Sequence, residues 1–553
     1  MHRNAALTLV TVAGLTAGAT ALSAQTFRRT SLETIGSDAD ERARLAQLLG
    51  LAPGTGAATA YLLRAPSTRT PRLPGDSTSL RWAFVTPEYA AVENSGVPFS
   101  LNDGAMWAGR GWNQVLRGGV RAEWRRFSLT IAPEVLQSDN LAFNLPPPDV
   151  ELPRPPDRSV YSSPWHIRPY SIDLPLQFGD RGFVHVDPGQ SALAATLGRV
   201  TAGVSTENEW WGPGVRNAIV LSNNAPGIPR LFFRTTRPLR GRLGTLDARW
   251  FAGGLTQSDY FYNYPAHDLR SIAGLALTWS PGFEPDLTLG FTRAVYAPVS
   301  GWSRIPPRLF DVFRNWGRPT DTAPGDSSQI PGRDQIYSFF GRWVFPKDGF
   351  ATYFEWARTA FPSGLRDLLI LPNDGQGYTL GLEWARPTRV GRDAIRVQAE
   401  ITYLEKGPAY RDRPQQTFYT SRRVVQGYTQ QGQVIGAAIG PGSSSQWLAV
   451  DYVAPTWRVG VFGGRIRWDD DALYSFTPTT FVGSKYCSHD VSLFGGVSGA
   501  TAGRWGKIAA AVSRAERLNP FFNHRTGCGP YQAPGDYLDV GNTTLIIRLS
   551  PPP

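Results

Sequence analysis

The sequence predicts a transmembrane antiparallel β-barrel of about 18 strands, preceded by a short N-terminal helical segment. Three observations support this prediction. From about residue 80, apolar and polar residues alternate with period two, as in strands that have one apolar face. The apolar faces end repeatedly in Trp, Tyr or Phe, as the aromatic girdles of a membrane barrel do. Short turns alternate with long loops rich in Pro, Gly and Asp.

Composition excludes several other classes of protein. The chain has 553 residues, of which 41% are hydrophobic and 18% are charged, against about 25% charged residues in soluble domains. Its 58 Gly and 45 Pro follow no G-X-Y period, and aromatic residues are plentiful, which excludes collagen-like, disordered and coiled-coil chains. After residue 24 no apolar run approaches the ~18 residues of a membrane helix, so a helical membrane protein is excluded as well.

The first 24 residues are predicted to be a secretory signal peptide. His2 and Arg3 precede an apolar, small-residue stretch from Ala5 to Leu22, and the small residues Ser23 and Ala24 offer two cleavage positions. We therefore expect export by a cleavable signal, with the bacterial outer membrane as the destination. An oxidising compartment would allow the two cysteines of the chain, Cys487 and Cys528, to form a single disulfide.

One convincing helix follows, over residues 37–50. Ser37 or Asp38 can cap it, acidic residues occupy its first turn, and Gly50 ends it. A Pro/Ser/Thr/Gly stretch at 65–79 separates this helix from the alternating region. We predict that residues 25–79 form a periplasmic helical segment with its linker, and that 80–553 form the barrel, with loops folded into its lumen.

The strands of the barrel are clearest in four segments. In 394–403 every second residue is apolar: Ile395, Val397, Ala399, Ile401 and Tyr403. The same alternation occurs in 286–292, 350–357 and 377–385. About 470 residues at roughly 25 per strand and connection give about 18 strands.

The connections and the last strand complete the barrel pattern. Short turns such as the one within 343–353 contrast with long loops such as 145–169 and 317–334, and this asymmetry is typical of outer-membrane barrels. The last predicted strand is 540–549, and SPPP follows it where such barrels commonly end on an aromatic residue that the assembly machinery recognises. Outer-membrane lipid and the barrel-assembly machinery are the partners that this fold requires.

The charge of the chain comes almost entirely from arginine. The formal net charge is +11, and four of the 56 basic residues are lysine, which leaves 52 arginines. A guanidinium group binds carboxylate or phosphate through two hydrogen bonds, so this composition suits acidic polysaccharides or phosphorylated lipid headgroups. A GC-rich genome would produce the same bias without a function. Nucleic acid is not an expected partner of an exported protein.

Five motifs together are similar to a known family. They are AGRGW at 108–112, DPGQS at 187–191, ENEWWGPG at 207–214, SNNAPGIP at 222–229 and GYTQQGQVIGAAIGPGSSSQ at 427–446. In this combination the sequence resembles the capsule-assembly Wzi family of outer-membrane proteins, over nearly the whole mature chain. The resemblance implies an 18-stranded outer-membrane barrel with a small periplasmic helical part. It also implies a lectin-like surface protein that helps to hold capsular polysaccharide on the cell.

The segment 205–239 contains the candidate polysaccharide-binding residues. Two adjacent indoles could offer a platform to sugar CH faces, amide and carboxyl groups could bind hydroxyls, and guanidinium groups could bind uronic carboxylates. The candidates are Glu207, Asn208, Trp210, Trp211, Arg216, Asn223, Asn224, Arg230 and Arg234. The alternative interpretation is that they brace a loop folded into the lumen, and a loop in that position could still contact polymer. We predict that this segment closes or narrows the lumen.

Nothing in the sequence indicates an enzyme, a metal site or a cofactor. The six His residues show no HxxxH spacing, and there is no G-x-S-x-G motif. Asp469, Asp470 and Asp471 are predicted to lie in a turn. A monomeric, lectin-like barrel that binds acidic cell-surface polysaccharide is therefore the first hypothesis. A porin-like diffusion channel and an outer-membrane hydrolase are the alternatives.

The two cysteines are predicted to meet at one rim of the barrel. Strands at 491–500 and 505–514, joined by a turn at 502–504, would form an antiparallel hairpin that brings Cys487 and Cys528 to the same end. The longer loops and the resemblance both place that rim on the extracellular side. Closing this loop would stabilise the fold by roughly 4 kcal/mol at most.

Overall fold

The computed structural model describes eleven stretches of the chain. They are residues 28–51, 61–145, 158–166, 170–261, 268–314, 332–362, 364–388, 392–407, 415–474, 489–522 and 539–552. The predicted signal peptide, Cys487 and Cys528 lie outside these stretches. The signal peptide and the disulfide therefore remain predictions.

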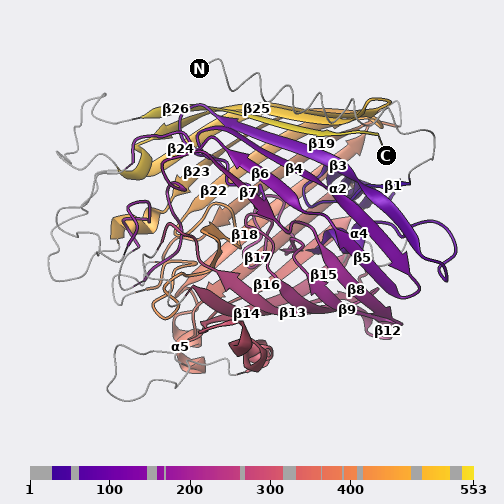
Figure 1. The fold of residues 1–553 in the computed structure, drawn as a ribbon, viewed down its shortest axis with the longest axis horizontal. Coiled ribbons are helices and arrows are strands. Elements are labelled where there is room, and N and C mark those ends of the chain that lie inside the picture. Colours follow the sequence, from indigo (N-terminus) through magenta and orange to yellow (C-terminus); the bar gives the residue numbers. More distant parts are fainter. Residues whose placement is uncertain are drawn as a thin grey trace.

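In the described part of the chain, 18 antiparallel strands close into a barrel (Figure 1). Fifteen of them are continuous: β3 (Arg81–Asn94), β4 (Gly111–Trp124), β9 (Val200–Ser205), β13 (Gly244–Thr256), β14 (Leu269–Pro281), β15 (Leu287–Pro298), β16 (Asp334–Phe345), β17 (Phe350–Thr359), β18 (Gln376–Pro387), β19 (Ala394–Tyr403), β22 (Ser444–Val453), β23 (Trp457–Trp468), β24 (Asp490–Gly503), β25 (Gly506–Leu518) and β26 (Val540–Ser550).

The other three strands are each interrupted once. Each consists of two pieces: β6 (Glu134–Ser138) continues β5 (Phe127–Ile131), β8 (Ala192–Leu197) continues β7 (Phe183–Asp187), and β12 (Leu239–Gly241) continues β11 (Arg230–Thr235). Pro133 and Pro188 lie in the first two interruptions, where the lack of a backbone N–H breaks the ladder.

The barrel closes where the last strand meets the first. Strand β26 pairs with β3 from Leu549 opposite Tyr89 to Thr544 opposite Asn94. Nearer its start, β3 pairs instead with the short parallel strand β1 (Arg29–Thr30), and the ladder is irregular between Val85 and Glu88. Two segments therefore pair in succession with this edge of β3, first β1 and then β26.

Burial along the strands is the reverse of that in a soluble protein. In β19 the apolar Ile401 is 47% exposed, while the neighbouring Glu400 is 2% exposed and faces the interior. The same holds for Leu380 and Leu382 on β18, which are exposed, while Glu383 is buried. Such a wall suits lipid outside and polar contacts inside. The predicted transmembrane antiparallel β-barrel of about 18 strands is thereby confirmed.

The two ends of the barrel differ in their connections. At the end that we call the short-turn end, strands join within a few residues, as at 345–350, 453–457 and 503–506. At the other end, the long-loop rim, the connections include 138–183, 298–334 and 403–444. The predicted asymmetry of turns and loops is confirmed. The predicted hairpin of β24 and β25 is also present, with its turn at the short-turn end.

The predicted helix is α2 (Asp38–Leu48), and it lies inside the barrel near the short-turn end. The Ser37 hydroxyl accepts from the Asp40 N–H at 3.3 Å, and Gly50 follows the helix in the left-handed conformation, with φ of +69°. Leu45 and Leu48 pack against apolar residues that face inward from four strands of the wall. No helix in the described residues is long and apolar enough to cross a membrane.

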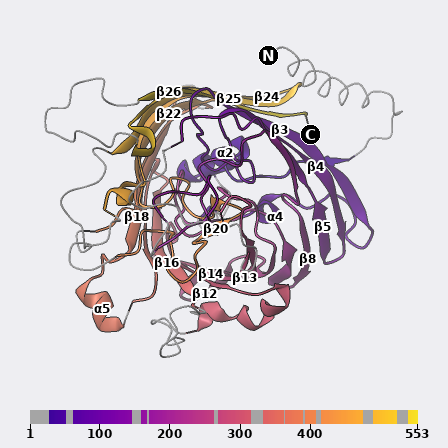
Figure 2. The ribbon, with the colours of Figure 1, turned by 60° about the vertical axis from the view of Figure 1, so that its left-hand side comes forward.

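Short elements occupy the interior and the loops. Those in the interior are β2 (Leu63–Arg64), α4 (Pro66–Arg69), β10 (Trp210–Trp211), β20 (Thr429–Gln430) and β21 (Gln433–Val434). Those in the long-loop connections are η2 (Trp302–Arg304), η3 (Pro306–Arg308), η4 (Asp311–Phe313), α5 (Leu365–Ile370), η6 (Asp470–Tyr474) and η8 (Pro520–Phe522). Figure 2 shows chain segments filling the space inside the wall.

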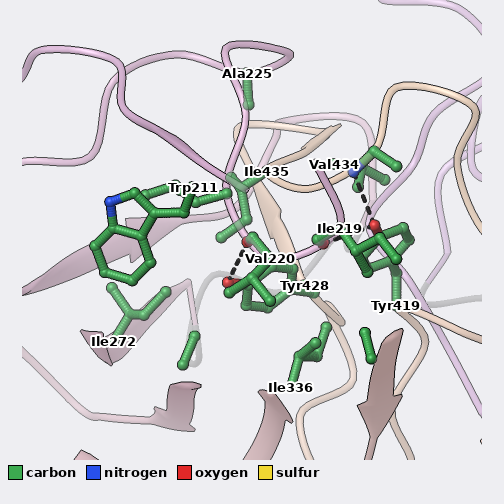
Figure 3. Close-up of a cluster of buried hydrophobic side chains, with 14 of the residues drawn as sticks. Trp211, Ile219, Val220, Ala225, Ile272, Ile336, Tyr419, Tyr428, Val434 and Ile435 are labelled. Atoms are coloured by element: carbon green, nitrogen blue, oxygen red, sulfur yellow. Dashed lines mark hydrogen bonds between the residues drawn. The ribbon is translucent and has the colours of Figure 1, made fainter. Parts of the chain in front are cut away.

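An apolar core joins these interior segments to the wall. Ile219 and Val220, with Val434 and Ile435, pack against inward-facing residues such as Ile336 on β16 (Figure 3). The Tyr419 hydroxyl donates to the Ile219 carbonyl, and the Tyr428 hydroxyl donates to the Val220 carbonyl, each at 2.8 Å. The barrel therefore has a packed core in its lumen, to which two distant connections contribute.

Candidate functional site

The segment 206–228 leaves strand β9 and crosses the interior to the opposite part of the wall. There the Glu400 carboxylate on β19 accepts from three consecutive backbone N–H groups, the Asn217 N–H lying at 2.8 Å. On β17, Glu355 accepts from the Ile219 N–H at 3.2 Å. Two inward carboxylates thus hold this segment across the lumen.

The two adjacent indoles of this segment are packed rather than displayed. Trp210 and Trp211 pair with Arg64 and Leu63 in a small antiparallel sheet, and Trp211 is fully buried. The indole N–H of Trp211 donates to Glu209 at 2.7 Å, and the Arg64 guanidinium lies over the Trp210 ring at 4.9 Å. Neither ring presents a face to solvent.

Glu209 is the acidic centre of this packed region. The Arg230 guanidinium lies 2.9 Å from the Glu209 carboxylate, and that of Arg249 lies 3.7 Å from it. Burial alone would raise the pKa of Glu209, but these two guanidinium groups hold it below its usual value. Arg230 is therefore committed to an internal ion pair.

Glu207 and Arg234 belong to a second internal network. The Glu207 carboxylate accepts from the backbone N–H and the hydroxyl of Ser67, at 2.8 and 2.6 Å, and Arg234 donates to the same hydroxyl at 3.0 Å. Burial raises the pKa of Glu207, and the nearby Arg234 and Ser67 only partly oppose this effect. The α4 segment is thus tied to the start of the crossing segment.

The remaining candidates are also bound within the protein. The Asn208 side chain donates to the Ala225 carbonyl and accepts from Gln190. Asn223 and Asn224 donate to the carbonyls of Asn102 and Val434. Arg216 lies over the Trp447 ring at 5.4 Å. The structure therefore brings all nine predicted residues together in the interior, six of them buried and three (Arg216, Asn223 and Asn224) half-buried.

Three cavities lie among the described residues near these groups. The largest, about 190 Å³, opens at the long-loop rim, and Asn224 is the one predicted residue that lines it. Asn208 and Asn223 line a cavity of about 60 Å³ inside the wall, and Arg216 lines one of about 20 Å³. The other five predicted residues line none of the three. We call the cavity of about 190 Å³ the rim cavity.

Aromatic side chains from several loops surround the rim cavity. Trp107 and Trp165 come from two separate connections, Trp468 is the last residue of β23, and each of the three is half-buried. The Trp165 ring stacks on Phe521, with 6.4 Å between ring centroids and 5° between planes. The Trp468 indole donates to Ser492, whereas the Trp165 indole N–H has no acceptor among the described residues. The rim cavity thus offers aromatic surface to a ligand.

Charged groups lie beside these rings. Arg517 lies 2.6 Å from Asp490, and its guanidinium lies over the Phe521 ring at 4.3 Å. The Asp469 carboxylate lies 2.7 Å from the His166 ring. Aromatic faces together with oriented polar groups are what a carbohydrate requires. No group of three or more His, Cys, Asp or Glu side chains within the described stretches could hold a metal ion.

Apart from Asn224, the sequence did not identify the residues of the rim cavity as site residues. Trp165 is about 300 residues from Trp468 and Phe521 in the chain, and only the folding of the loops brings the three together. A usable signal did exist, because each of these aromatic residues lies in or beside a long connection. Aromatic residues in long connections are not needed for the wall, which favours a role at the surface.

The comparisons with known proteins agree with this architecture. Residues 96–297 match the model of the family described as capsule assembly protein Wzi, which confirms the resemblance found in the sequence. No curated protein sequence matches the chain. Among solved structures, the chain is similar to Wzi of Escherichia coli, an outer membrane protein involved in group 1 capsule assembly and a carbohydrate-binding β-barrel. That match has 13% identity, covers 85% of each chain and has a TM-score of 0.50.

Two other solved structures are similar to the chain at lower identity and lower TM-score. OccAB2 of Acinetobacter baumannii has 9% identity and a TM-score of 0.38, with 84% of this chain and 97% of that chain covered. OprB of Pseudomonas putida has 9% identity and a TM-score of 0.35, with 85% and 94% covered. At 13% identity, the likeness to the Escherichia coli structure shows the fold alone.

Proposed function

We propose that this protein is an outer-membrane β-barrel that binds capsular or extracellular polysaccharide at the cell surface, as a lectin does, and aids its attachment or assembly. The observation that carries this proposal is the rim cavity, where three indoles and an Arg–Asp pair surround a space of about 190 Å³ above a filled lumen. The family match and the carbohydrate-binding similar structure support it.

Within this proposal the predicted residues have two roles. Asn224 lines the rim cavity and contacts the polymer directly. The other eight position the loops, since they hold the crossing segment to the wall and to the interior segments through the bonds described above. Contact between any of these nine residues and the polymer remains a prediction.

Binding to a panel of glycans tests the proposed function. Purified full-length protein in detergent micelles is applied to an array that includes uronate-containing and neutral polysaccharides. We expect saturable binding to acidic polymers, because guanidinium groups bind carboxylates through two hydrogen bonds. Absence of binding to every polymer on the array would contradict the proposal.

A conductance measurement tests the filled lumen. In a planar bilayer we expect negligible single-channel conductance, because apolar residues of the crossing segment pack against the inward face of the wall. A stable, large conductance would instead favour a porin-like channel. Hydrolysis of phospholipid or lipopolysaccharide esters by the same preparation would favour an enzyme and would contradict the lectin-like function.

The remaining features of the proposal concern the mature protein. We propose cleavage after Ser23 or Ala24, a monomeric state, and a disulfide between Cys487 and Cys528 at the long-loop rim. The described residues flanking the cysteines, Asp490 and Leu518, lie at the same end of the β24–β25 hairpin, which supports the pairing. Mass spectrometry of non-reduced digests tests it, and free thiols at both positions would contradict it.

A further inference from the structure

The outer face of the wall contains an unexpected polar row near the long-loop rim. On β15 the side chains of Leu289 and Phe291 face outward, and by the period of two Arg293 does so too. Its cross-strand neighbour is Tyr337 on β16, whose own neighbour is Arg358 on β17. Two arginines and a tyrosine thus form a row on the face that elsewhere presents apolar residues.

The position of this row along the barrel axis would place charged side chains within the apolar part of the membrane. Arg293 lies six residues along β15 from Leu287, which is about 15 Å along the barrel axis for a strand tilted by ~40°. The apolar band of such a barrel is about 25 Å tall, and an exposed arginine in it costs about 2–4 kcal/mol at the midplane. The row would therefore lie in lipid unless something covered it.

Two connections from the long-loop rim fold outward and cover it. The Arg293 guanidinium is fully buried and donates to the carbonyls of Val312 and Arg314, at 2.7 and 2.9 Å. Arg358 is likewise buried, and Asp367 and Asp374 lie 3.9 and 3.8 Å from it. We call these two covering segments, residues 299–314 and 364–374, the outer patch. Figure 2 shows α5 outside the wall.

The outer patch is fitted closely to the wall. The Trp302 ring lies over Gly254 of β13, where a Cβ atom would come within 2.6 Å of the ring, so only glycine permits this approach. Phe310 stacks on the outward Trp250, with 5.7 Å between ring centroids. Val312 packs against the outward Ala252 and Ala273. This face of the outer patch is a packed interface.

The outer patch is also apolar where it faces away from the wall, because Trp302 and Phe310, which contact the wall, are only partly covered by it. Trp302, Phe310 and Phe313 are 56%, 59% and 56% exposed, and Leu369 of α5 is 72% exposed. Such a surface is unfavourable in water, and it continues the apolar band of the wall below it. Exposed arginines border it, namely Arg304, Arg314 and Arg366. A row of rings beside guanidinium groups is the pattern of a membrane–water interface.

We propose that the outer patch is a lipid-binding surface, which inserts its apolar side chains into the outer leaflet and binds phosphate groups of its lipids through Arg304, Arg314 and Arg366. This inference rests on the membrane location in the proposed function but not on polysaccharide binding. The occupant is a phosphate-bearing lipid, because its acyl chains match the exposed rings and its phosphates match the three guanidinium groups. The acidic side chains Asp367 and Asp374 face Arg358 of the wall and leave Arg366 exposed. Arg314 lies 3.0 Å from the buried Asp311, and its side chain is still 54% exposed.

The test measures lipid binding by the purified full-length protein in detergent micelles. The probes are diphosphorylated lipid A and the same lipid after removal of both phosphates, and the readouts are the shift in Tm and the number of lipids retained in native mass spectrometry. We expect lipid A to raise Tm and to be retained, and the dephosphorylated lipid to bind at least about tenfold more weakly.

Two matched triple variants locate the site. Arg304→Gln with Arg314→Gln and Arg366→Gln should bind lipid A at least about tenfold more weakly than the wild type. The control replaces three exposed arginines at the short-turn end, Arg199→Gln with Arg386→Gln and Arg504→Gln, and should bind as the wild type does. Both variants should still migrate as heat-modifiable barrels, because none of these side chains is buried.

Three results would overturn the proposal. They are equal binding of the two lipids, equal loss of binding in the two variants, and a wild-type dimer that the outer-patch variant alone converts to a monomer. The last would show that a second copy of the chain occupies the surface. Polysaccharide binding is measured on the same preparations and should be unchanged. Its absence from the wild type would contradict the proposed function without affecting the lipid result.

Discussion

The crossing segment and the rim cavity use the same residue types in opposite ways. Both contain Trp beside acidic and basic groups, and in both one indole N–H, that of Trp210 or of Trp165, has no acceptor among the described residues. Trp210 lines none of the three cavities, whereas Trp165 lines the largest. The comparison shows that residue type indicates what a group can bind, while depth decides whether a ligand can reach it.

The largest expected effect comes from removing the two indole side chains of the crossing segment. Trp210→Ala with Trp211→Ala should lower the free energy of unfolding by about 5 kcal/mol or more, since one buried Trp→Ala change costs about 3–5 kcal/mol. Heat-modifiable migration and urea titration measure this loss. If the folded fraction still bound polysaccharide like the wild type, the indoles would be packing residues. Weaker binding with unchanged stability would make them ligand contacts and would reverse the comparison.

Removing one buried charge should open the interior. Glu383 accepts from Arg44 of α2 at 2.7 Å and from Arg342 of the wall at 3.2 Å. Glu383→Gln leaves both guanidinium groups buried without their carboxylate, which costs about 3–5 kcal/mol. We expect α2 to detach and planar-bilayer conductance to appear. Glu516→Gln, which changes an exposed ion pair, is the control and should leave the lumen closed.

A smaller effect is expected at the rim. Trp165→Ala should weaken polysaccharide binding by about tenfold, because it removes an aromatic wall from the rim cavity. Isothermal titration with the best polymer from the array measures the change. Trp505→Ala, at the exposed short-turn end, should leave the affinity as it is. Equal losses in both variants would show that the rim cavity is not the binding site.

The smallest effect concerns pH. Burial raises the pKa of Asp471 from 3.8 to about 6, although Lys406, whose backbone N–H donates to the carboxyl at 2.8 Å, opposes this shift. A raised pKa means that the folded loop favours the protonated form. The protonated carboxyl of Asp471 therefore stabilises the folded loop fully below about pH 3.8, and this stabilisation is lost as pH rises through about 6.

Hydrogen exchange of the rim loops between pH 4 and pH 7 checks this expectation. Protection in the wild type, corrected for intrinsic exchange, should fall by roughly three- to tenfold over that range. In Asp471→Asn, which stays neutral, it should not fall. The same dependence in both proteins would exclude Asp471 as its source, and the rim would then be no more pH-sensitive than the crossing segment.

The wall could be predicted from the sequence because its pattern is local. The alternation of Ile401 with Glu400 places one side chain in lipid and the other in the lumen, and chain length then gives the strand number. The helix cap at Ser37 is also local, since it requires only the three residues that follow. Both predictions depend on neighbours in the chain, so one sequence was sufficient.

The interior and the rim depend on contacts that no local pattern encodes. The Glu400 carboxylate binds the backbone of Asn217, and the pairing becomes visible only when the crossing segment is folded. Arg293 fits the outward position of its strand by period two, yet a loop covers it. The nine candidates lie together in the interior, but their burial could not be predicted because it depends on the loops packed around them.

The seam between β3 and β26 has a consequence for the kinetics of folding. Its pairs join residues about 450 positions apart, such as Thr544, whose hydroxyl donates to the Asn94 side chain at 2.8 Å. Because the chain is synthesised from its N-terminus, the part of the β3 edge that β1 does not cover stays unpaired until β26 has been made. Contacts of such high sequence separation form slowly, and an open edge can pair with another chain in the meantime. A chaperone that shields the edge of β3 before closure would therefore raise the yield of folded barrel more than one that shields any central strand.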